Sequence, residues 1–339
     1  METPGGCGRP LHGSWYPWFF GVRNRRSDWA AVIVSASYRT DIPAFYARWF
    51  QERLAAGEVW VANPYGGPPS RVSLAPGSVD GWVFWTRNPI PFGAALEAVA
   101  ARGAPFVVQM TVLGYPRALD VAVIPPDRAL AAMRDLRERY GRHAVVWRHD
   151  PIVFSDLTPA AWHRETFARH ARALRGVVDE VVVSVLQVYA KSRRNLDRQA
   201  SRHGFSWRDP PDDEKRALLA DLAAIAAEEG LRFSLCGQEA LRADLPGVEA
   251  AACVDAARLS AIAGRAITAR PKPHRRCGCA ESRDIGAYDT CPHGCAYCYA
   301  VRNQDLAKRR FAMHDPTTAF LDRTDPPPPP RSDPQGRLL

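Results

Sequence analysis

The sequence predicts an α/β fold: a (βα)-barrel of the TIM type, partial or permuted, followed by a C-terminal cysteine-rich loop. Its 339 residues suit one large domain, and 46% hydrophobic residues suffice for a core. Apolar runs typical of strands buried on both faces alternate at least seven times with helical patterns. This alternation favours a parallel sheet with right-handed crossovers. The sequence contains neither G-x-G-x-x-G after a strand nor G-x4-G-K-[ST], so the dinucleotide-binding and P-loop fingerprints are missing.

The elements are expected in the following order along the chain. Strands are predicted at 30–37, 59–62, 72–74, 81–85, 106–111, 144–147, 180–185 and 231–235, and helices at 44–56, 90–101, 127–140, 159–174 and 213–229. Residues 193–211 are predicted to form a long polar loop. A basic helix is expected through 308–310, after the cysteines.

The chain divides into four predicted segments. Residues 1–28 lack periodicity and are expected to be a poorly ordered extension, in which Cys7 has no assigned role. The barrel is predicted over 29–270, and the cysteine-rich segment with its closing helix over 271–322. Residues 323–339 contain five consecutive prolines and are expected to be a disordered tail.

Composition bounds the setting and the partners. No apolar run approaches membrane-spanning length, so we expect a cytoplasmic protein without a membrane partner. The formal net charge is +9 and the isoelectric point is about 9.3. A solvated basic surface explains this charge most simply. The alternative is a nucleic-acid partner on an Arg-rich face at 270–276 and 302–310, with Tyr297 and Tyr299 as stacking aromatics.

Charged side chains recur where the predicted strands end. Arg39 and Asp41 follow the first strand, Arg87 follows the strand at 81–85, and Arg148 and Asp150 follow the strand at 144–147. Barrel enzymes place their active sites at the C-terminal ends of strands, so we predict a catalytic rim here. Such a rim would bind a carboxylate. The alternative is that these residues form structural ion pairs.

Three closely spaced thiols follow the barrel. Cys291, Cys295 and Cys298 have the spacing C-x3-C-x2-C. A [4Fe–4S] cluster usually takes four cysteines, so three would leave one iron open to a small molecule. The alternative is a zinc site that adds Cys277, Cys279 and His293 as ligands.

Apart from Cys7, four further thiols lie outside this motif: Cys236, Cys253, Cys277 and Cys279. Four is the number that a second iron–sulfur cluster or a structural zinc ion takes. Cys236 and Cys253 also fit the description of buried thiols that pack as small hydrophobic side chains. Asp284 lies between the two cysteine groups, in a stretch that we expect to shape the cluster pocket.

The cysteine spacing, with Tyr297 just before the third thiol, resembles the cluster motif of radical S-adenosylmethionine (SAM) enzymes. The resemblance implies an open iron that chelates SAM, an electron donor such as ferredoxin or flavodoxin, and cleavage of SAM to methionine and a 5′-deoxyadenosyl radical. A clear Gly-Gly-Glu element for the SAM amino group is missing, and Glu239 is the expected substitute. In those enzymes the cluster loop follows the first strand, whereas here it follows the last. Because a barrel is cyclic, a permuted order can bring the loop to the same mouth.

Several segments together resemble the family catalogued as domain of unknown function 1848, over roughly residues 30–322. They are 35–45, 63–64, 83–89, 148–152, 253–255 and 277–291. Tyr38 and His149 depart from that family's pattern, which weakens a catalytic role for either. The leading hypothesis is an enzyme with a [4Fe–4S] cluster and SAM that performs radical chemistry on an unknown substrate. The alternatives are a zinc-stabilised barrel hydrolase or lyase and a nucleic-acid-interacting protein.

Overall fold

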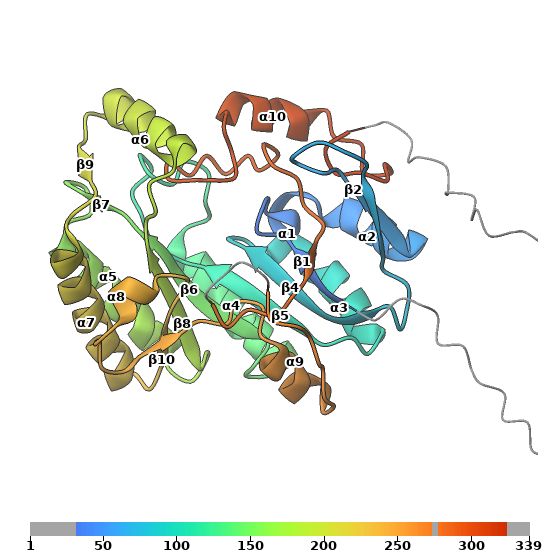
Figure 1. The fold of residues 1–339 in the computed structure, drawn as a ribbon, viewed down its shortest axis with the longest axis horizontal. Coiled ribbons are helices and arrows are strands. Elements are labelled where there is room, and N and C mark those ends of the chain that lie inside the picture. The colour runs from blue at the N-terminus through green and yellow to red at the C-terminus, as the bar shows by residue number, and fades with distance from the viewer. Residues whose placement is uncertain (1–31, 273–276, 324–339) are drawn as a thin grey trace, which may run out of the picture. The chain divides into compact units, whose positions relative to one another are not determined.

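The computed structural model describes residues 32–272 and 277–323 (Figure 1). Its main feature is a parallel sheet of eight strands in the order β11-β10-β8-β6-β5-β4-β1-β12. The strands are β1 (Val32–Ala36), β4 (Val79–Thr86), β5 (Phe106–Thr111), β6 (Val145–Ile152), β8 (Glu180–Val185), β10 (Arg232–Leu235), β11 (Val248–Ala250) and β12 (Arg283–Asp284). The strands of this sheet from β1 to β11 follow one another across it in chain order, and β12 returns to pair with β1. The predicted α/β class is therefore confirmed, but the ladder has β11 and β12 as its two edges, so barrel closure is not shown.

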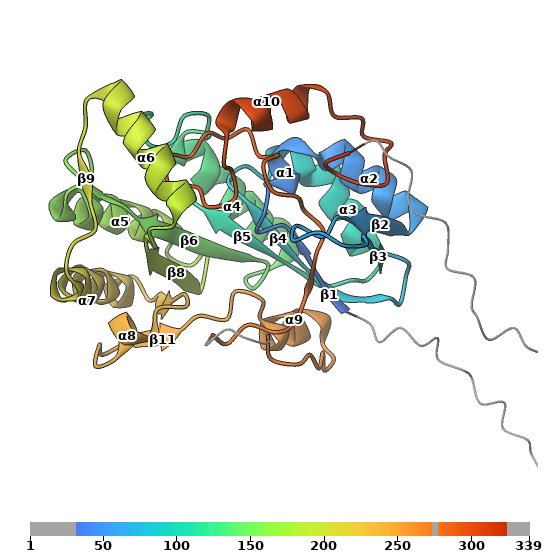
Figure 2. The same ribbon diagram turned by 45° about the horizontal axis from the view of Figure 1, so that its top comes forward.

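Helices connect these strands and flank the sheet. They are α1 (Ile42–Phe45), α2 (Ala47–Ala56), α3 (Gly93–Ala101), α4 (Pro126–Tyr140), α5 (Ala160–Leu174), α6 (Ala190–His203), α7 (Asp212–Glu228), α8 (Glu239–Arg242), α9 (Ala256–Ala263) and α10 (Gln304–Ala312), with a 3-10 turn η1 at Ile90–Phe92. In both ribbon views, α9 lies at the bottom and α6 and α10 lie at the top (Figures 1 and 2). Every helix in the described part of the chain is too short or too polar to cross a membrane.

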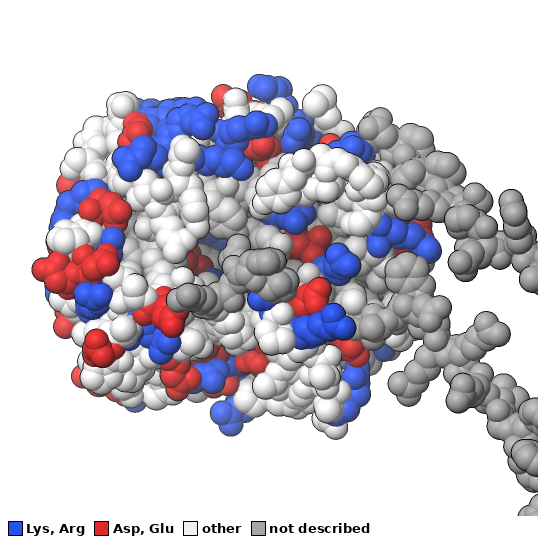
Figure 3. All heavy atoms as spheres, in the orientation of Figure 1, with Lys and Arg blue, Asp and Glu red and all other residues white. Residues whose placement is uncertain are grey.

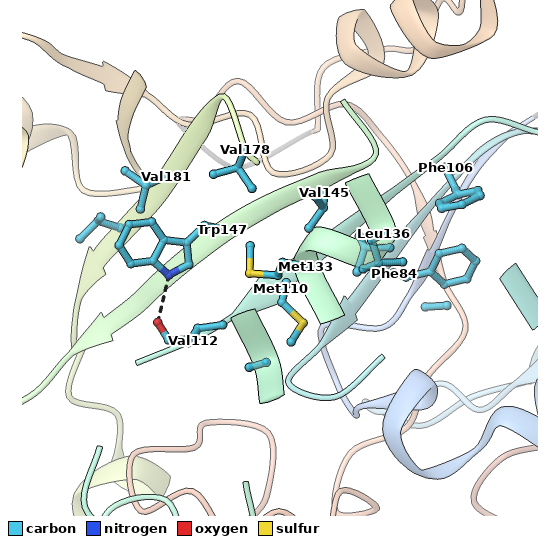
Figure 4. Close-up of a cluster of buried hydrophobic side chains, with 14 of the residues drawn as sticks. Phe84, Phe106, Met110, Val112, Met133, Leu136, Val145, Trp147, Val178 and Val181 are labelled. Atoms are coloured by element: carbon cyan, nitrogen blue, oxygen red, sulfur yellow. Dashed lines mark hydrogen bonds between the residues drawn. The ribbon is translucent and has the colours of Figure 1, made fainter. Parts of the chain in front are cut away.

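The two faces of the sheet bury different side chains, because side chains alternate between faces along a strand. The outer face packs against the helices, and Figure 4 shows part of this core around Trp147, whose indole N–H donates to the Val112 carbonyl at 3.0 Å. The opposite face, which we call the inner face, packs against α9. It carries an aliphatic cluster that includes Val83, Val146 and Leu259 of α9. Aliphatic residues therefore fill this face, and two residues farther along the strands it carries Trp85 of β4 and four polar side chains: Ser35, Gln109, Arg148 and Ser184.

One predicted strand lies outside the main sheet, and one predicted loop is a helix. The predicted strand 59–62 exists as β2 (Glu58–Val61), but it pairs antiparallel with β3 (Ser70–Ser73) outside the main sheet. The predicted loop 193–211 is mostly the helix α6, followed by β9 (Trp207–Arg208), which pairs with β7 (Phe154–Ser155). The predictions for residues 1–28 and for the tail from 324 onward lie outside the described residues.

Candidate cysteine site at the strand ends

A network of polar side chains crosses the inner face of the sheet near the carboxyl ends of its strands. Gln109 lies directly opposite Trp85 in the β4–β5 register. The Trp85 indole N–H donates to the Ser35 hydroxyl at 3.0 Å, and Ser35 donates to Asp284 at 2.9 Å. The Arg148 guanidinium lies 5.0 Å from the centre of the Trp85 ring. The expected grouping of polar side chains at the strand ends is therefore present, from β12 to β6.

Arg87, at the end of β4, forms a bidentate ion pair with Asp120. Its two terminal nitrogens donate to the two Asp120 oxygens at 2.8 and 2.6 Å. Both side chains are almost fully buried. The Tyr297 hydroxyl donates to Asp120 at 2.6 Å and also contacts the Arg87 guanidinium. These contacts therefore join the end of β4, the segment after β5 and the cysteine loop. The Arg87 side chain is held in a structural ion pair.

The loop that carries the three spaced thiols docks on the segment between β5 and α4. Its backbone reaches that segment at two points, where Ala296 N donates to Leu119 O at 2.9 Å and Ala122 N donates to His293 O at 2.9 Å. Gly294 has φ +77°, a conformation that favours glycine, and a Cβ at that position would lie 2.9 Å from Val121 Cβ. The turn of this loop therefore depends on a glycine at 294.

The loop carries its three thiols to the carboxyl ends of the strands, the mouth of the sheet, where Cys295 contacts Arg87. An Arg87 nitrogen donates to Cys295 Sγ at 3.3 Å, and the Ala300 backbone N–H donates to Cys298 Sγ at 3.3 Å. Burial raises the pKa of Cys291, Cys295 and Cys298, and that of Cys295 reaches about 12. Negative charge on one of these sulfurs raises the pKa of its neighbours in the loop. The free thiols therefore stay protonated at neutral pH, and a metal that binds them must displace protons.

Asp41 and His293 cross-link the loop to α1. The His293 ring nitrogen Nε2 lies 2.8 Å from an Asp41 oxygen, and His293 Nδ1 lies 3.3 Å from the Ala122 carbonyl. Asp41 also accepts from the backbone N–H of Arg87 at 2.8 Å and caps α1 through Ala44 N. Both ring nitrogens of His293 therefore have protein partners, and the predicted catalytic Asp41 has a positioning role in this structure.

Arg39 and Asp284 meet at the other side of the mouth. Asp284 accepts from Ser37 at 2.7 Å and from the backbone N–H groups of Tyr38 and Gly286 at 3.0 Å each. Burial raises the pKa of Asp284, and these hydrogen bonds and the Arg39 charge, 3.7 Å away, oppose that rise. Asp284 therefore fixes the turn that leads from β12 toward the cysteine loop.

Comparison with known families identifies the chain. The family model described as Domain of unknown function (DUF1848) matches residues 33–300. The chain belongs to the DUF1848 family. Among solved structures, one match is a crystal structure of D-hydantoinase, at 8% sequence identity and a TM-score of 0.28, covering 61% of this chain and 41% of that chain. Similarity at that level supports no conclusion about fold or activity. The curated proteins gave no match.

The second group of thiols in this DUF1848 protein lies elsewhere, against Arg148. Cys253 Sγ lies 3.4 Å from Cys236 Sγ and accepts a hydrogen bond from an Arg148 nitrogen at 3.1 Å. Cys279 is a further hydrogen-bond partner of Cys253. Hydrogen bonds from Cys236 and Cys279, followed by the Arg148 charge, hold the pKa of Cys253 well below its ordinary value. The other terminal nitrogen of Arg148 pairs with Asp150, which also contacts Ser184.

The two cysteine groups are separate sites. Cys277 and Cys279 pack in the inner-face cluster with Cys253, whereas Cys295 and Cys298 pack with Tyr115 and Leu119 in another cluster. A single zinc ion that joins both groups, as one alternative predicted, does not match this separation. Across residues 32–272 and 277–323, no group of three or more His, Cys, Asp or Glu side chains is arranged to hold a metal ion.

The remaining predicted cofactor contacts have different surroundings. Glu239 begins α8 and lines a pocket of about 410 Å³ together with Gln238, Arg242 and Cys277, on the side of the second cysteine group. The Tyr297 ring packs edge-on against Tyr115, with a centroid distance of 5.7 Å, and its hydroxyl binds Asp120. Glu239 therefore lines a pocket beside Cys277, and Tyr297 is part of the wall behind Cys295.

Two residues of the site were missed in the sequence. Asp120 lies in an irregular segment after β5, where no periodicity marks it as buried. Asn195 lies in the helix that was predicted as a loop, and its side-chain amide donates to the carbonyls of Val301 at 2.8 Å and Cys298 at 3.4 Å. The sequence signal that could have found Asp120 is a single carboxylate between two short apolar stretches, 118–119 and 121–124.

Proposed function

We propose that this DUF1848 protein is an iron–sulfur enzyme that holds a [4Fe–4S] cluster on Cys291, Cys295 and Cys298 and uses SAM for radical chemistry on an unknown substrate. One observation carries the proposal: the loop that bears the three thiols reaches the carboxyl ends of the strands, where Cys295 accepts from Arg87 of the buried Arg87–Asp120 pair. The loop follows the last strand, yet it contacts the end of β4. The permuted chain order is therefore compatible with a cluster at the active-site end of the sheet.

The spacing of the thiols favours a cluster over a single metal ion. Four thiolates around one zinc ion would have sulfurs roughly 3.8 Å apart, from a Zn–S bond of about 2.3 Å and tetrahedral angles. A cluster takes one thiolate per iron, so its ligands lie farther apart. Cys291, Cys295 and Cys298 influence one another electrostatically. Their C-x3-C-x2-C spacing, with Tyr297 before the third thiol, supports a multi-iron centre over zinc.

The chain's own groups would stabilise the sulfurs in their charged form. Arg87 N–H and Ala300 N–H donate to Cys295 and Cys298. Hydrogen bonds to cluster sulfurs and a nearby cation raise the reduction potential of such a centre. The chemistry that the bound cluster supplies is one-electron reduction of SAM at its open iron. Asp120 holds Arg87 in place, so it acts as a positioning residue.

The partly exposed charges at the mouth are the best candidates for binding the amino-acid part of SAM. The Asp150 side chain is 22% exposed and the Arg39 side chain 16%, whereas that of Arg87 is 9% exposed. Asp150 would take the ammonium group and Arg39 the carboxylate. Arg87, which the sequence placed among the catalytic residues, is assigned instead to support of the cluster loop.

Anaerobic SAM cleavage tests the proposal. We expect the reconstituted, reduced protein to release 5′-deoxyadenosine, followed by chromatography. Asp150→Asn and Arg39→Gln should keep the iron content but lose most of the cleavage. The matched control is Asp221→Asn, which removes one partner of an exposed ion pair with Arg164. A protein that contains the cluster but neither binds nor cleaves SAM would contradict the SAM part of the proposal.

The electron donor would dock on the basic surface of α6. This surface consists of Arg193, Arg194, Arg198 and Arg202, all exposed. Figure 3 shows Lys and Arg gathered over this helix at the top of the view. On its buried side, Asn195 contacts the Cys298 carbonyl, so an acidic protein on α6 would lie about one helix diameter, roughly 10 Å, from the cluster loop.

Charge reversal at Arg194 and Arg198 should slow reduction by an acidic flavodoxin. If a random oligonucleotide supports salt-sensitive binding and flavodoxin does not, the surface is a nucleic-acid site instead.

A further inference from the structure

We propose that Cys236 and Cys253 form a second reactive site, a dithiol that reduces hydroperoxides and is activated by Arg148. This inference is independent of the cluster proposed above. It differs from the sequence prediction of a second metal centre on these thiols, and the experiment below separates the two. The basis is the contact geometry: two sulfurs at 3.4 Å, with a buried guanidinium beside one of them.

The backbone presents the two sulfurs to each other. Cys236 follows β10 directly, and its N–H donates to Val183 O at 2.8 Å. Cys253 lies just beyond β11, which pairs with β10, and the Gln109 amide donates to the Cys253 carbonyl at 3.0 Å. A disulfide has an S–S bond of about 2.05 Å, so these sulfurs need to approach by roughly 1.4 Å. Rotation of the two side chains is the movement that we expect to close this gap.

Arg148 makes Cys253 the more reactive of the two thiols. Its nitrogen lies 3.1 Å from Cys253 Sγ, and only 5% of its side chain is exposed. A cation next to a thiol stabilises the thiolate, which is the nucleophilic form. In addition, Cys236 and Cys279 can donate their S–H groups to that sulfur. Cys253 is thus the attacking residue and Cys236 the resolving residue.

A small oxidant has a route to this pair. Cys236 is partly exposed, and the residues on either side of it, Leu235 and Gly237, line the pocket of about 410 Å³ together with Ala251. Cys253 itself is buried, which favours an oxidant of nearly the size of water. Hydrogen peroxide meets this requirement, whereas a bulky disulfide such as oxidised glutathione does not.

The reaction balances with peroxide as the oxidant. The Cys253 thiolate attacks one peroxide oxygen, the O–O bond breaks, and hydroxide leaves and takes a proton to become water. Cys253 is then a sulfenic acid. The Cys236 sulfur attacks Cys253 Sγ, the S–S bond forms, and the sulfenic oxygen leaves as a second water with the proton of Cys236. The two thiols supply two electrons, and one hydrogen peroxide becomes two waters.

The test treats the full-length reduced protein with one equivalent of hydrogen peroxide under anaerobic conditions, followed by alkylation and peptide mass spectrometry. We expect a Cys236–Cys253 disulfide. Cys236→Ser should stop the reaction at a sulfenic acid on Cys253 that dimedone traps. Arg148→Gln, which removes the positive charge beside Cys253, should slow oxidation by about tenfold. Cys277→Ser is the matched control and should still form the disulfide.

Iron and zinc are measured in the same samples, so that this proposal and the cluster proposal fail separately. Loss of iron on peroxide treatment, with Cys236 and Cys253 still reduced, would overturn the dithiol and leave the cluster standing. Stoichiometric metal that protects these two cysteines would overturn it in favour of the second metal centre. Disulfide formation in a protein that never takes up iron would support the dithiol and contradict the cluster.

Discussion

The buried pair of Arg87 and Asp120 gives the sharpest energetic prediction. Asp120 accepts from Arg87 at 2.8 and 2.6 Å and from Tyr297 at 2.6 Å, and the Arg87 and Asp120 side chains are only 9% and 5% exposed. Removal of one partner leaves an uncompensated buried charge, which costs about 3–5 kcal/mol. We therefore expect Asp120→Ala and Arg87→Ala each to lower the free energy of unfolding by that amount. Replacement of both by apolar residues of similar size, Arg87→Met with Asp120→Leu, should cost far less than the two single losses together.

Urea unfolding at pH 7, followed by circular dichroism, measures these differences. The matched control is the exposed pair of Arg164 and Asp221, whose side chains are 43% and 46% exposed and whose closest atoms lie 2.7 Å apart. Arg164→Ala should cost less than about 1 kcal/mol. The interpretation fails if Asp120→Ala costs no more than this control, or if the Arg87 and Asp120 costs simply add in the double variant.

Two further predictions concern two buried histidines and a tightly packed glycine. Burial lowers the pKa of His163 and of His170 to about 4 each, so the unfolded chain binds protons below its ordinary pKa of about 6.5 before the folded chain does. Stability is therefore full above that pH and falls as the pH drops toward 4, by about 2 kcal/mol per histidine between pH 7 and pH 5; equal unfolding free energies at the two pH values would contradict this. A Cβ at Gly286 would lie 2.5 Å from Ser37 Cβ and closer still to its hydroxyl, so Gly286→Ala should break the Ser37–Asp284 contact and lower the melting temperature. Gly93→Ala is the matched control, because that position has open space and no positive φ, and it should leave the melting temperature nearly unchanged.

The parallel sheet was predictable because its strands are short apolar runs buried on both faces. The same runs ended in Arg and Asp, and strands that share a direction bring such ends together, so the grouping of Arg39, Arg87 and Arg148 at one mouth followed from the sequence. The partner of each arginine was harder to foresee. Asp150 and Asp284 were named as site residues, but Asp120 comes from an irregular segment.

Helix α6 shows where periodicity fails as a guide. Its buried face consists of Ser192, Asn195, Leu196 and Gln199, of which only Leu196 is apolar. A helix that buries amides against backbone carbonyls has no hydrophobic stripe, so the sequence reads as a polar loop. The strand at 59–62 was predicted correctly, but its place outside the main sheet was not. Its Val59 is buried, but the hairpin with β3 supplies the pairing that a place in the main sheet would have supplied.

The iron and sulfide content of the anaerobically reconstituted protein tests the central claim most directly. We predict about four irons and four sulfides per chain, with visible absorption that disappears in Cys291→Ala, Cys295→Ala and Cys298→Ala. Cys277→Ala is the matched control, because Cys277 packs in the separate group with Cys253, and it should keep the full absorption. Full absorption in all three loop variants, or a reconstituted protein without iron, would contradict the account.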